Sequence, residues 1–318
     1  MHQITFRAMG CTILALVDTD DLAAEVTLRT VPDWFEAWEA CLSRFRANSE
    51  LMQLNQQAGL DGVIVSPTLW SVLDLALDAA YASDGLVTPT LLAALVEAGY
   101  DRDFATLSTI DPRTYEPSRS PKRQASLSRM RDWHTLERDP SSRMIWLPHG
   151  MALDLGGFAK GWAAERVVQR LAHYGPVLVD AGGDIAVSGP RRDGSPWPIA
   201  VTDPRNAAQL PVLVLLTTGG VASSGRDYRR WQQGDVVSHH IIDPRTGAPA
   251  VTDLLAVTVV APDLRTAELA AKVTLIQGSV AGLAWLEARP DLAGLLITDD
   301  GRLIQTATWP AVCWKEGL

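Results

Sequence analysis

Apolar and polar residues follow two rhythms in the first hundred residues of this chain. An alternation with period two over residues 2–18, broken at Gly10, predicts a strand with an interruption. Apolar residues then recur every three to four positions, as on one face of a helix, and predict helices at 21–46, 67–83 and 90–99. Pro32 is expected to interrupt the first helix or to start a second one, because proline lacks the N–H that a helix interior needs.

The second half of the chain predicts many short strands. Residues 144–155 alternate as a strand, and residues 159–173 follow with the spacing of a helix. Strands separated by glycine and proline are predicted at 177–180, 185–187, 197–201, 213–216, 239–242 and 256–260. Two helices, at 266–277 and 282–289, and a hairpin with strands at 292–298 and 303–306 complete the pattern. Asp300-Gly301 is the expected turn of that hairpin.

This order of elements predicts the α+β class. Early helices and later short strands favour a mixed, largely antiparallel sheet with flanking helices, in a two-lobed single domain that spans residues 1–318. The stretch 101–143 is polar, locally basic and rich in proline. It predicts an irregular surface insertion, with a helical turn or two near residues 126–133.

Composition limits the classes of function. The 318 residues suffice for one large domain, and a hydrophobic content of 47% is ample for a core. The net charge of −9 argues against broad nucleic-acid binding. No apolar run approaches the roughly 20 residues that span a bilayer, and the N-terminus lacks the pattern of a secretory signal. The three scattered cysteines have no metal-binding spacing, so a cytoplasmic protein without a membrane segment is expected.

Residues 153–161, Leu-Asp-Leu-Gly-Gly-Phe-Ala-Lys-Gly, carry the strongest local signal. They predict a strand that ends at Asp154, a tight glycine turn and a helix that begins near Phe158. Such a junction directs backbone N–H groups and a partial positive charge at one point, which suits a phosphate. Lys160 adds a full positive charge and Asp154 a carboxylate. The segment therefore favours a ligand with both a negatively charged part and a hydrogen-bond-donating part, such as a nucleotide.

Seven blocks of this sequence occur in the order of one known family. They are Met9-Gly-Cys-Thr, Leu42–Glu50 with Leu54-Asn55, Gly85–Thr90, Asp154–Gly161, Val179–Asp184, Val221–Gly225 and His240–Gly247. Together they resemble the ApbE family, the FAD:protein FMN transferases, from about Met9 to about Gly278. Each block alone is weak evidence, whereas seven in the right order are strong.

The resemblance implies a transferase that acts on FAD. Such an enzyme attaches FMN through a phosphoester to a Thr or Ser of an acceptor flavoprotein and releases AMP. In the family the acceptor carries a Ser/Thr-Gly-Ala-Thr-like segment, which this chain lacks, so the chain resembles the enzyme and not its acceptor. Two alternatives remain open: an FAD-binding carrier or assembly protein without catalysis, and an FAD hydrolase that gives FMN and AMP.

The resemblance also implies which residues bind FAD: Met9, Phe45, Ala98, Gly99, Tyr100, Asp154, Lys160 and Ile242. Met9 and Phe45 can pack on flat rings, with plain core packing as the alternative. Asp154 can accept hydrogen bonds from a ring amine or a ribose hydroxyl. Lys160 can meet the pyrophosphate, and a cation near a helix N-terminus is electrostatically misplaced unless an anion lies there.

The catalytic and metal residues are carried over in the same way. His240 is implied to manage the proton of the attacking hydroxyl, with a structural role as the alternative. In the family an Asp and a Thr four residues later hold Mg²⁺ together with a backbone carbonyl of the Gly-Gly turn. Gly157 and Glu268 match two of these ligands here, but Lys272 replaces the hydroxyl, and an ammonium does not coordinate a metal. We therefore expect no tightly bound magnesium and a catalytic Lys272 facing the FAD phosphates; an ordinary Glu268–Lys272 helical ion pair is the alternative.

Overall fold

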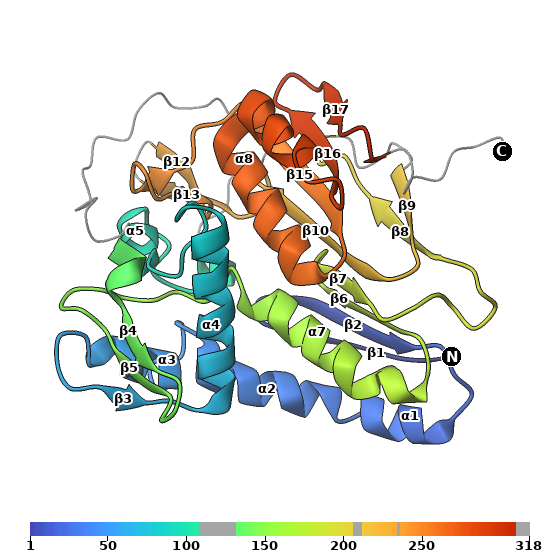
Figure 1. Cartoon of the computed structure of the whole chain (residues 1–318), viewed down its shortest axis with the longest axis horizontal. Coiled ribbons are helices and arrows are strands. Elements are labelled where there is room, and N and C mark those ends of the chain that lie inside the picture. Colours follow the sequence, from blue (N-terminus) through green and yellow to red (C-terminus); the bar gives the residue numbers. More distant parts are fainter. Residues whose placement is uncertain (108–131, 206–211, 234–235, 310–318) are drawn as a thin grey trace. The chain divides into compact units, whose positions relative to one another are not determined.

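The computed structural model describes residues 1–107, 132–205, 212–233 and 236–309 (Figure 1). Contacts divide the chain into two compact units. The sheet unit consists of Met1–Trp34, Lys160–Asp227 and Thr252–Leu318, and the insert unit of Phe35–Ala159 and Tyr228–Val251. The α+β class and the largely antiparallel sheet are confirmed. The assignment of residues 1–318 to one domain stays a prediction.

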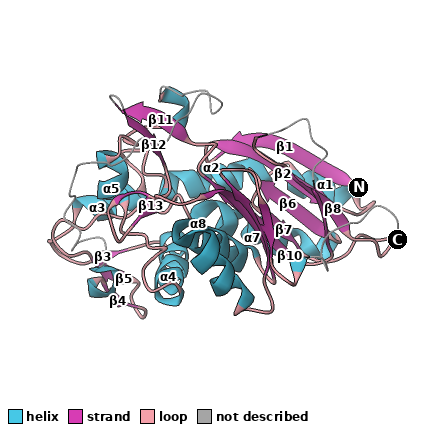
Figure 2. Ribbon diagram, turned by 90° about the horizontal axis from the view of Figure 1, so that it is seen from above, coloured by secondary structure: helices cyan, strands magenta, loops and turns pink. Residues whose placement is uncertain are grey.

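An eight-stranded sheet forms the sheet unit, and every neighbouring pair in it is antiparallel. In sheet order its strands are β1 (His2–Ala8), β2 (Cys11–Val17), β6 (Val177–Ala181), β7 (Ile185–Val187), β10 (Gly219–Gly225), β15 (Leu254–Ala261), β16 (Ala293–Thr298) and β17 (Leu303–Gln305). Figure 2 shows the first of these strands side by side. A separate hairpin is formed by β8 (Trp197–Val201) and β9 (Val212–Leu216).

Strand β10 was not predicted from the residue pattern. Its sequence, Gly-Gly-Val-Ala-Ser-Ser-Gly, is poor in the β-branched and aromatic residues that favour strands. The small residues have a packing role instead, because a Cβ on Gly220 would lie 2.5 Å from the backbone nitrogen of Leu264. Glycine at this position therefore lets the start of helix α8 (Leu264–Glu287) approach the sheet closely.

Helix α8 packs against β10, β15 and β16. Asp263 caps its N-terminus by accepting a hydrogen bond from Thr266 N at 2.8 Å. The predicted division into two helices corresponds to a kink at Gly278, whose φ of 82° is not helical. Among the described helices, only α8 is long and apolar enough to cross a membrane. This is weak evidence for a span, because a buried core helix has the same composition.

Two further helices belong to the sheet unit, namely α1 (Leu22–Leu28) and α7 (Ala159–Leu171). Asp21 caps α1 by accepting from Ala23 N at 2.9 Å. Pro32 starts a new helix and does not merely interrupt one, since α2 (Val31–Leu42) begins one residue before it.

Helices and short strands make up the insert unit. They are α3 (Glu50–Gln56), β3 (Val63–Ile64), α4 (Pro67–Ala82), α5 (Leu92–Glu97), β4 (Glu137–Asp139), β5 (Met144–Trp146), β11 (Arg230–Gln233), β12 (Val236–His239), β13 (Ile242–Asp243) and β14 (Ala248–Pro249). Helix α4 begins at Pro67 as predicted, with Ser66 as its N-cap.

Three sequence predictions in the insert unit need correction or limits. The strand predicted at 144–155 ends at Trp146, and the strand predicted at 239–242 is interrupted between β12 and β13. The stretch 101–143 contains β4 and the 3₁₀ turn Phe104–Thr106, which were not predicted, whereas the 3₁₀ turn Asp132–Thr135 overlaps the helical turn expected near residues 126–133. Residues 108–131 of that stretch lie outside the described residues.

Candidate functional site

The segment before α7 is extended without being a strand. Its backbone groups bond to side chains and to a single carbonyl instead of a strand partner. The amide of Asn55 accepts from Leu153 N at 2.8 Å and donates to Leu153 O at 2.9 Å, and Asp154 N donates to Pro89 O at 2.8 Å. Gly156 N then donates to Oδ1 of Asp154 at 3.0 Å. The predicted glycine turn is therefore present, and helix α7 begins at Ala159.

Asp154 is held by a buried arginine that the sequence analysis did not select. Nε of Arg44 lies 2.8 Å from Oδ2 of Asp154, and the two side chains are only 5% and 12% exposed. Burial raises the pKa of the Asp154 carboxyl, while the charges of Arg44 and Arg229 act in the opposite direction. Nη1 of Arg44 also donates to the carbonyl of Tyr100 at 2.7 Å.

Aromatic rings surround this guanidinium. Its carbon lies 4.1 Å from the ring centroid of Phe45 and 4.4 Å from that of Tyr100. Tyr100 stacks on Trp231 with ring centroids 5.0 Å apart, and Nε1 of Trp231 donates to the carbonyl of Ala98 at 2.7 Å. We call Arg44, Phe45, Tyr100, Asp154 and Trp231 the stacking cluster.

Several of the predicted FAD residues meet at the stacking cluster. Phe45, Tyr100 and Asp154 belong to it, and Ala98 and Ile242 pack in the same buried apolar group as Tyr100 and Trp231. Gly99, whose φ is 93°, lies between two of these residues. Arg44 and Trp231 were missed: Arg44 lies in the motif block Leu42–Glu50 beside the predicted Phe45, but the residue pattern does not separate a ligand contact from ordinary packing for either residue.

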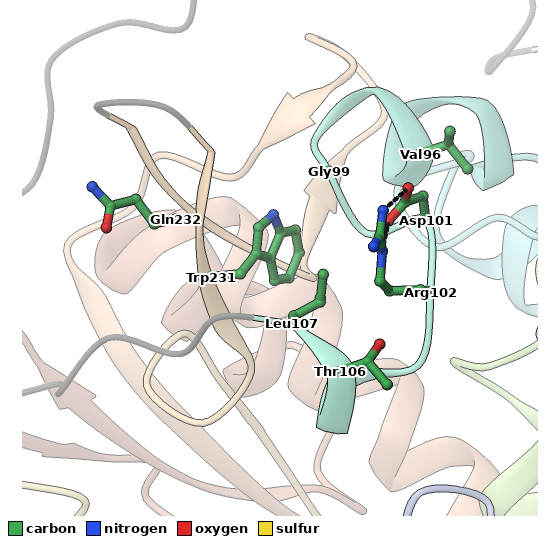
Figure 3. A pocket seen from close by; sticks show the side chains of 8 residues that line it. All are labelled: Val96, Gly99, Asp101, Arg102, Thr106, Leu107, Trp231 and Gln232. Carbon is green, nitrogen blue, oxygen red and sulfur yellow. Dashed lines mark hydrogen bonds and ion pairs between the residues drawn. The ribbon is translucent and has the colours of Figure 1, made fainter.

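A pocket of about 350 Å³ lies in the insert unit and shares residues with this region (Figure 3). It is lined by Val96, Gly99, Asp101, Arg102, Thr106, Leu107, Trp231 and Gln232. Nε of Arg102 pairs with Asp101 at 2.8 Å within the lining. The volume is at the lower end of the range for small-molecule pockets.

A second group of predicted residues lies in the sheet unit. Lys160, in the first turn of α7, forms an ion pair between its Nζ and Oδ2 of Asp184. Asp184 follows a turn in which Gly182 and Gly183 have φ values of 73° and 96°, a conformation that glycine adopts readily. The anion expected beside Lys160 is therefore supplied by the chain itself in this structure.

Glu268 lies deep in the same unit and is 5% exposed. A Cβ on Gly161 would lie 2.6 Å from its Cδ, so the carboxyl packs directly on the first turn of α7. Burial raises the pKa of Glu268 to about 8; Lys272 and Lys160 oppose the shift, and Asp184 adds to it. We call Lys160, Asp184, Glu268 and Lys272 the charge cluster.

The residues of the charge cluster do not fit a magnesium ion. Mg²⁺ requires several oxygen ligands in octahedral geometry, whereas Glu268 is neighboured by the positive charges of Lys272 and Lys160. Gly157, the other predicted ligand, is half-buried in the turn before α7.

Met9 and His240 lie in strained or irregular backbone. Met9 and Gly10, with φ values of 51° and 69°, form the two-residue turn between β1 and β2. A positive φ is uncommon for methionine. His240 is half-buried between β12 and β13, next to His239, whose Nδ1 accepts from Ile241 N at 3.3 Å. His239 still pairs with Arg230 in β11 and β12, and the strand ends there, before His240.

The exposed ring of Phe45, next to the buried ion pair of Arg44 and Asp154, suits a protein that binds a planar heterocycle. Comparison with known families is consistent with this class, because the model of the ApbE family matches residues 9–296. The chain belongs to the ApbE family.

Relatives and solved structures agree with the family assignment. An FAD:protein FMN transferase of Treponema pallidum is 33% identical over 90% of this chain and 81% of its own length. An FAD:protein FMN transferase of Vibrio cholerae is 29% identical over 92% of this chain and 86% of its own length. The crystal structure of an ApbE protein from Thermotoga maritima, 23% identical, superposes with a TM-score of 0.83 over 98% of this chain and 99% of its own. The structure of the flavin transferase ApbE from V. cholerae, 24% identical, superposes with a TM-score of 0.76 over 98% of both chains.

Proposed function

We propose that this chain is an FAD:protein FMN transferase. The observation that supports it most directly is the stacking cluster, which combines aromatic rings with a buried carboxylate and guanidinium in a member of the ApbE family. The curated relatives named above carry this activity in their names. FAD is the substrate in this proposal, and an acceptor flavoprotein with a Ser/Thr-Gly-Ala-Thr-like segment is the partner.

The reaction is a phosphoryl transfer. The hydroxyl oxygen of the acceptor Thr or Ser forms a bond to the FMN phosphorus, the bond from that phosphorus to the bridging oxygen breaks, and AMP leaves. The hydroxyl proton passes to a base, and we assign this role to the half-buried His240, because an imidazole can accept a proton.

The second requirement is a positively charged group beside the FAD phosphates, which offsets their negative charge. We propose that Lys160 and Lys272 supply it in place of magnesium, because the donor set of the charge cluster does not suit a divalent ion. Lys160 is paired with Asp184 in this structure, so contact with a phosphate would require Lys160 to share or exchange that partner.

A single assay separates this function from its alternatives. The protein is incubated with FAD and an acceptor fragment, with Mg²⁺ or with EDTA, and AMP release and the acceptor mass are followed. AMP release with a mass gain of one FMN supports the transferase. AMP release without the mass gain indicates an FAD hydrolase, and FAD binding with neither product indicates a carrier or assembly protein.

A cytoplasmic location is also part of the proposal. Cys41 is a thiol that donates to Oε2 of Glu50 at 3.0 Å, and burial raises its pKa to about 12, so it is poorly reactive. A reduced, half-buried cysteine is compatible with the cytoplasm. Cell fractionation with an antibody against the chain would test the location.

A further inference from the structure

One nitrogen of the Arg44 side chain has no hydrogen-bond partner in the described part of the chain. Its Nε forms an ion pair with Asp154 and its Nη1 donates to the carbonyl of Tyr100, whereas its Nη2 is buried and has no hydrogen-bond partner among the described residues. A buried guanidinium nitrogen without a partner is costly, and native proteins rarely leave one. The atom therefore points to a ligand.

The guanidinium is also fixed in place. An ion pair with Asp154 and a hydrogen bond to the carbonyl of Tyr100 hold it at different nitrogens, and it lies over the rings of Phe45 and Tyr100. Since all its N–H groups lie in one plane, these contacts determine the direction in which Nη2 donates. Phe45 is 41% exposed, so part of its ring is accessible to a ligand.

We propose that Arg44 and Asp154 together read the edge of a flat heterocycle, with Nη2 of Arg44 donating to a ring acceptor and Asp154 accepting from the neighbouring N–H. This inference rests on the proposed function, because it takes FAD as the substrate. Both ends of FAD offer this chemistry. Adenine has N1 beside the 6-amino group, and the isoalloxazine ring has carbonyl oxygens beside N3–H.

The variant Arg44→Lys tests the role of Nη2. Lysine keeps a positive charge beside Asp154 but lacks the planar fork of three nitrogens. We expect Arg44→Lys to weaken FAD binding about 10- to 100-fold, the range for a lost charge-assisted hydrogen bond. Arg46→Lys is the matched control, since Arg46 lies two residues away and pairs with Glu36 and Glu39. Its FAD affinity should stay within about twofold of wild type.

Fragments of FAD distinguish the two ends. Wild type and Arg44→Lys are titrated with FAD, ADP, FMN and riboflavin by calorimetry. If the adenine edge is read, ADP binding falls by the same factor as FAD binding and FMN is unaffected. If the isoalloxazine edge is read, FMN and riboflavin lose affinity and ADP does not. Either pattern supports the proposal.

A ligand-side test avoids any question of folding. Methylation of the reading edge, as N⁶,N⁶-dimethyl-ADP or 3-methylriboflavin, removes the N–H that Asp154 would accept and should weaken binding to wild type about 10-fold or more. FAD binding and FMN transfer by wild type, combined with unchanged affinities in Arg44→Lys and for the methylated ligands, would overturn this inference alone. A wild-type protein that binds no FAD would overturn the proposed function as well.

Discussion

The effect of Gly161→Ala on the free energy of unfolding should depend on residue 268 and should change sign when Glu268 is shortened. Glu268 packs on the first turn of α7, where a Cβ on Gly161 would lie 2.6 Å from Cδ of Glu268. In an unhindered helix, Gly→Ala stabilises by about 1 kcal/mol. Here the new methyl group must displace a side chain that is 5% exposed, and overpacking a well-filled site costs about 1–3 kcal/mol. We expect Gly161→Ala to destabilise the protein by about 1 kcal/mol net.

Shortening the acid removes the conflict. In the Glu268→Asp background the carboxyl is one methylene further from α7, so Gly161→Ala should regain its helical advantage and stabilise by about 1 kcal/mol. The interaction energy of the double-mutant cycle is then about 2 kcal/mol, which is well above the error of additivity for independent sites. Chemical denaturation of all four proteins without FAD measures it, with equal m-values required.

The sign of the Gly161→Ala effect decides the outcome. A stabilising effect in both backgrounds would mean that Glu268 moves aside freely, and the close packing of the charge cluster would be wrong. An equally destabilising effect in both backgrounds would mean that the added methyl group clashes with an atom other than those of the Glu268 carboxyl.

Four further predictions concern the charges and the catalytic histidine. Lys160→Ala should weaken FAD binding by about 1–3 kcal/mol, while riboflavin, which lacks phosphates, binds unchanged; equal losses for both ligands in a fluorescence titration would refute the assignment. His240→Ala should lower turnover by about 10²–10⁴-fold with little change in FAD affinity, and unchanged AMP release would leave the histidine a structural role. Lys272→Thr, combined with Glu268→Asp, should create or strengthen Mg²⁺ dependence of AMP release, whereas a stoichiometric divalent ion bound by Glu268 in the native protein would contradict the expectation. The raised pKa of Glu268 means that the native state keeps a proton which the unfolded state loses near pH 4.5, so the contribution of this group to stability should fall as the pH rises from 4.5 toward about 8. The free energy of unfolding of Glu268→Gln should depend less on pH across this range. Identical pH profiles of the variant and the wild type would count against the raised pKa.

Local sequence determined the elements whose signals lie within a few residues of one another. The hairpin of β16 and β17 formed as predicted, because Gly301, with a φ of 96°, meets the demand of its turn. Helix α4 has its predicted start, because Ser66 and Pro67 satisfy the needs of a helix N-terminus without help from the rest of the chain. Seven ordered motifs were likewise sufficient for the family, which the match over residues 9–296 confirmed.

Strand β10 and the segment before α7 depended on partners distant in sequence. The glycines and serines of β10 have low strand propensity, but β7, β15 and α8 place them in the middle of the sheet. Leu153 looks like part of a strand, yet the side chain of Asn55 takes both of its backbone groups. A local pattern cannot report such competition for hydrogen bonds.

Arg44 and Arg46 show the same limit at the candidate site. Both are cations in one short segment, and nothing in the residue pattern separates them. Arg46 pairs with Glu36 and Glu39, whereas Arg44 is buried against Asp154 and Tyr100. The sequence, through the family resemblance, predicted Asp154 and Tyr100 as site residues. Only the tertiary structure decided which arginine joins them, because a buried charge is set by the partners that the fold brings to it.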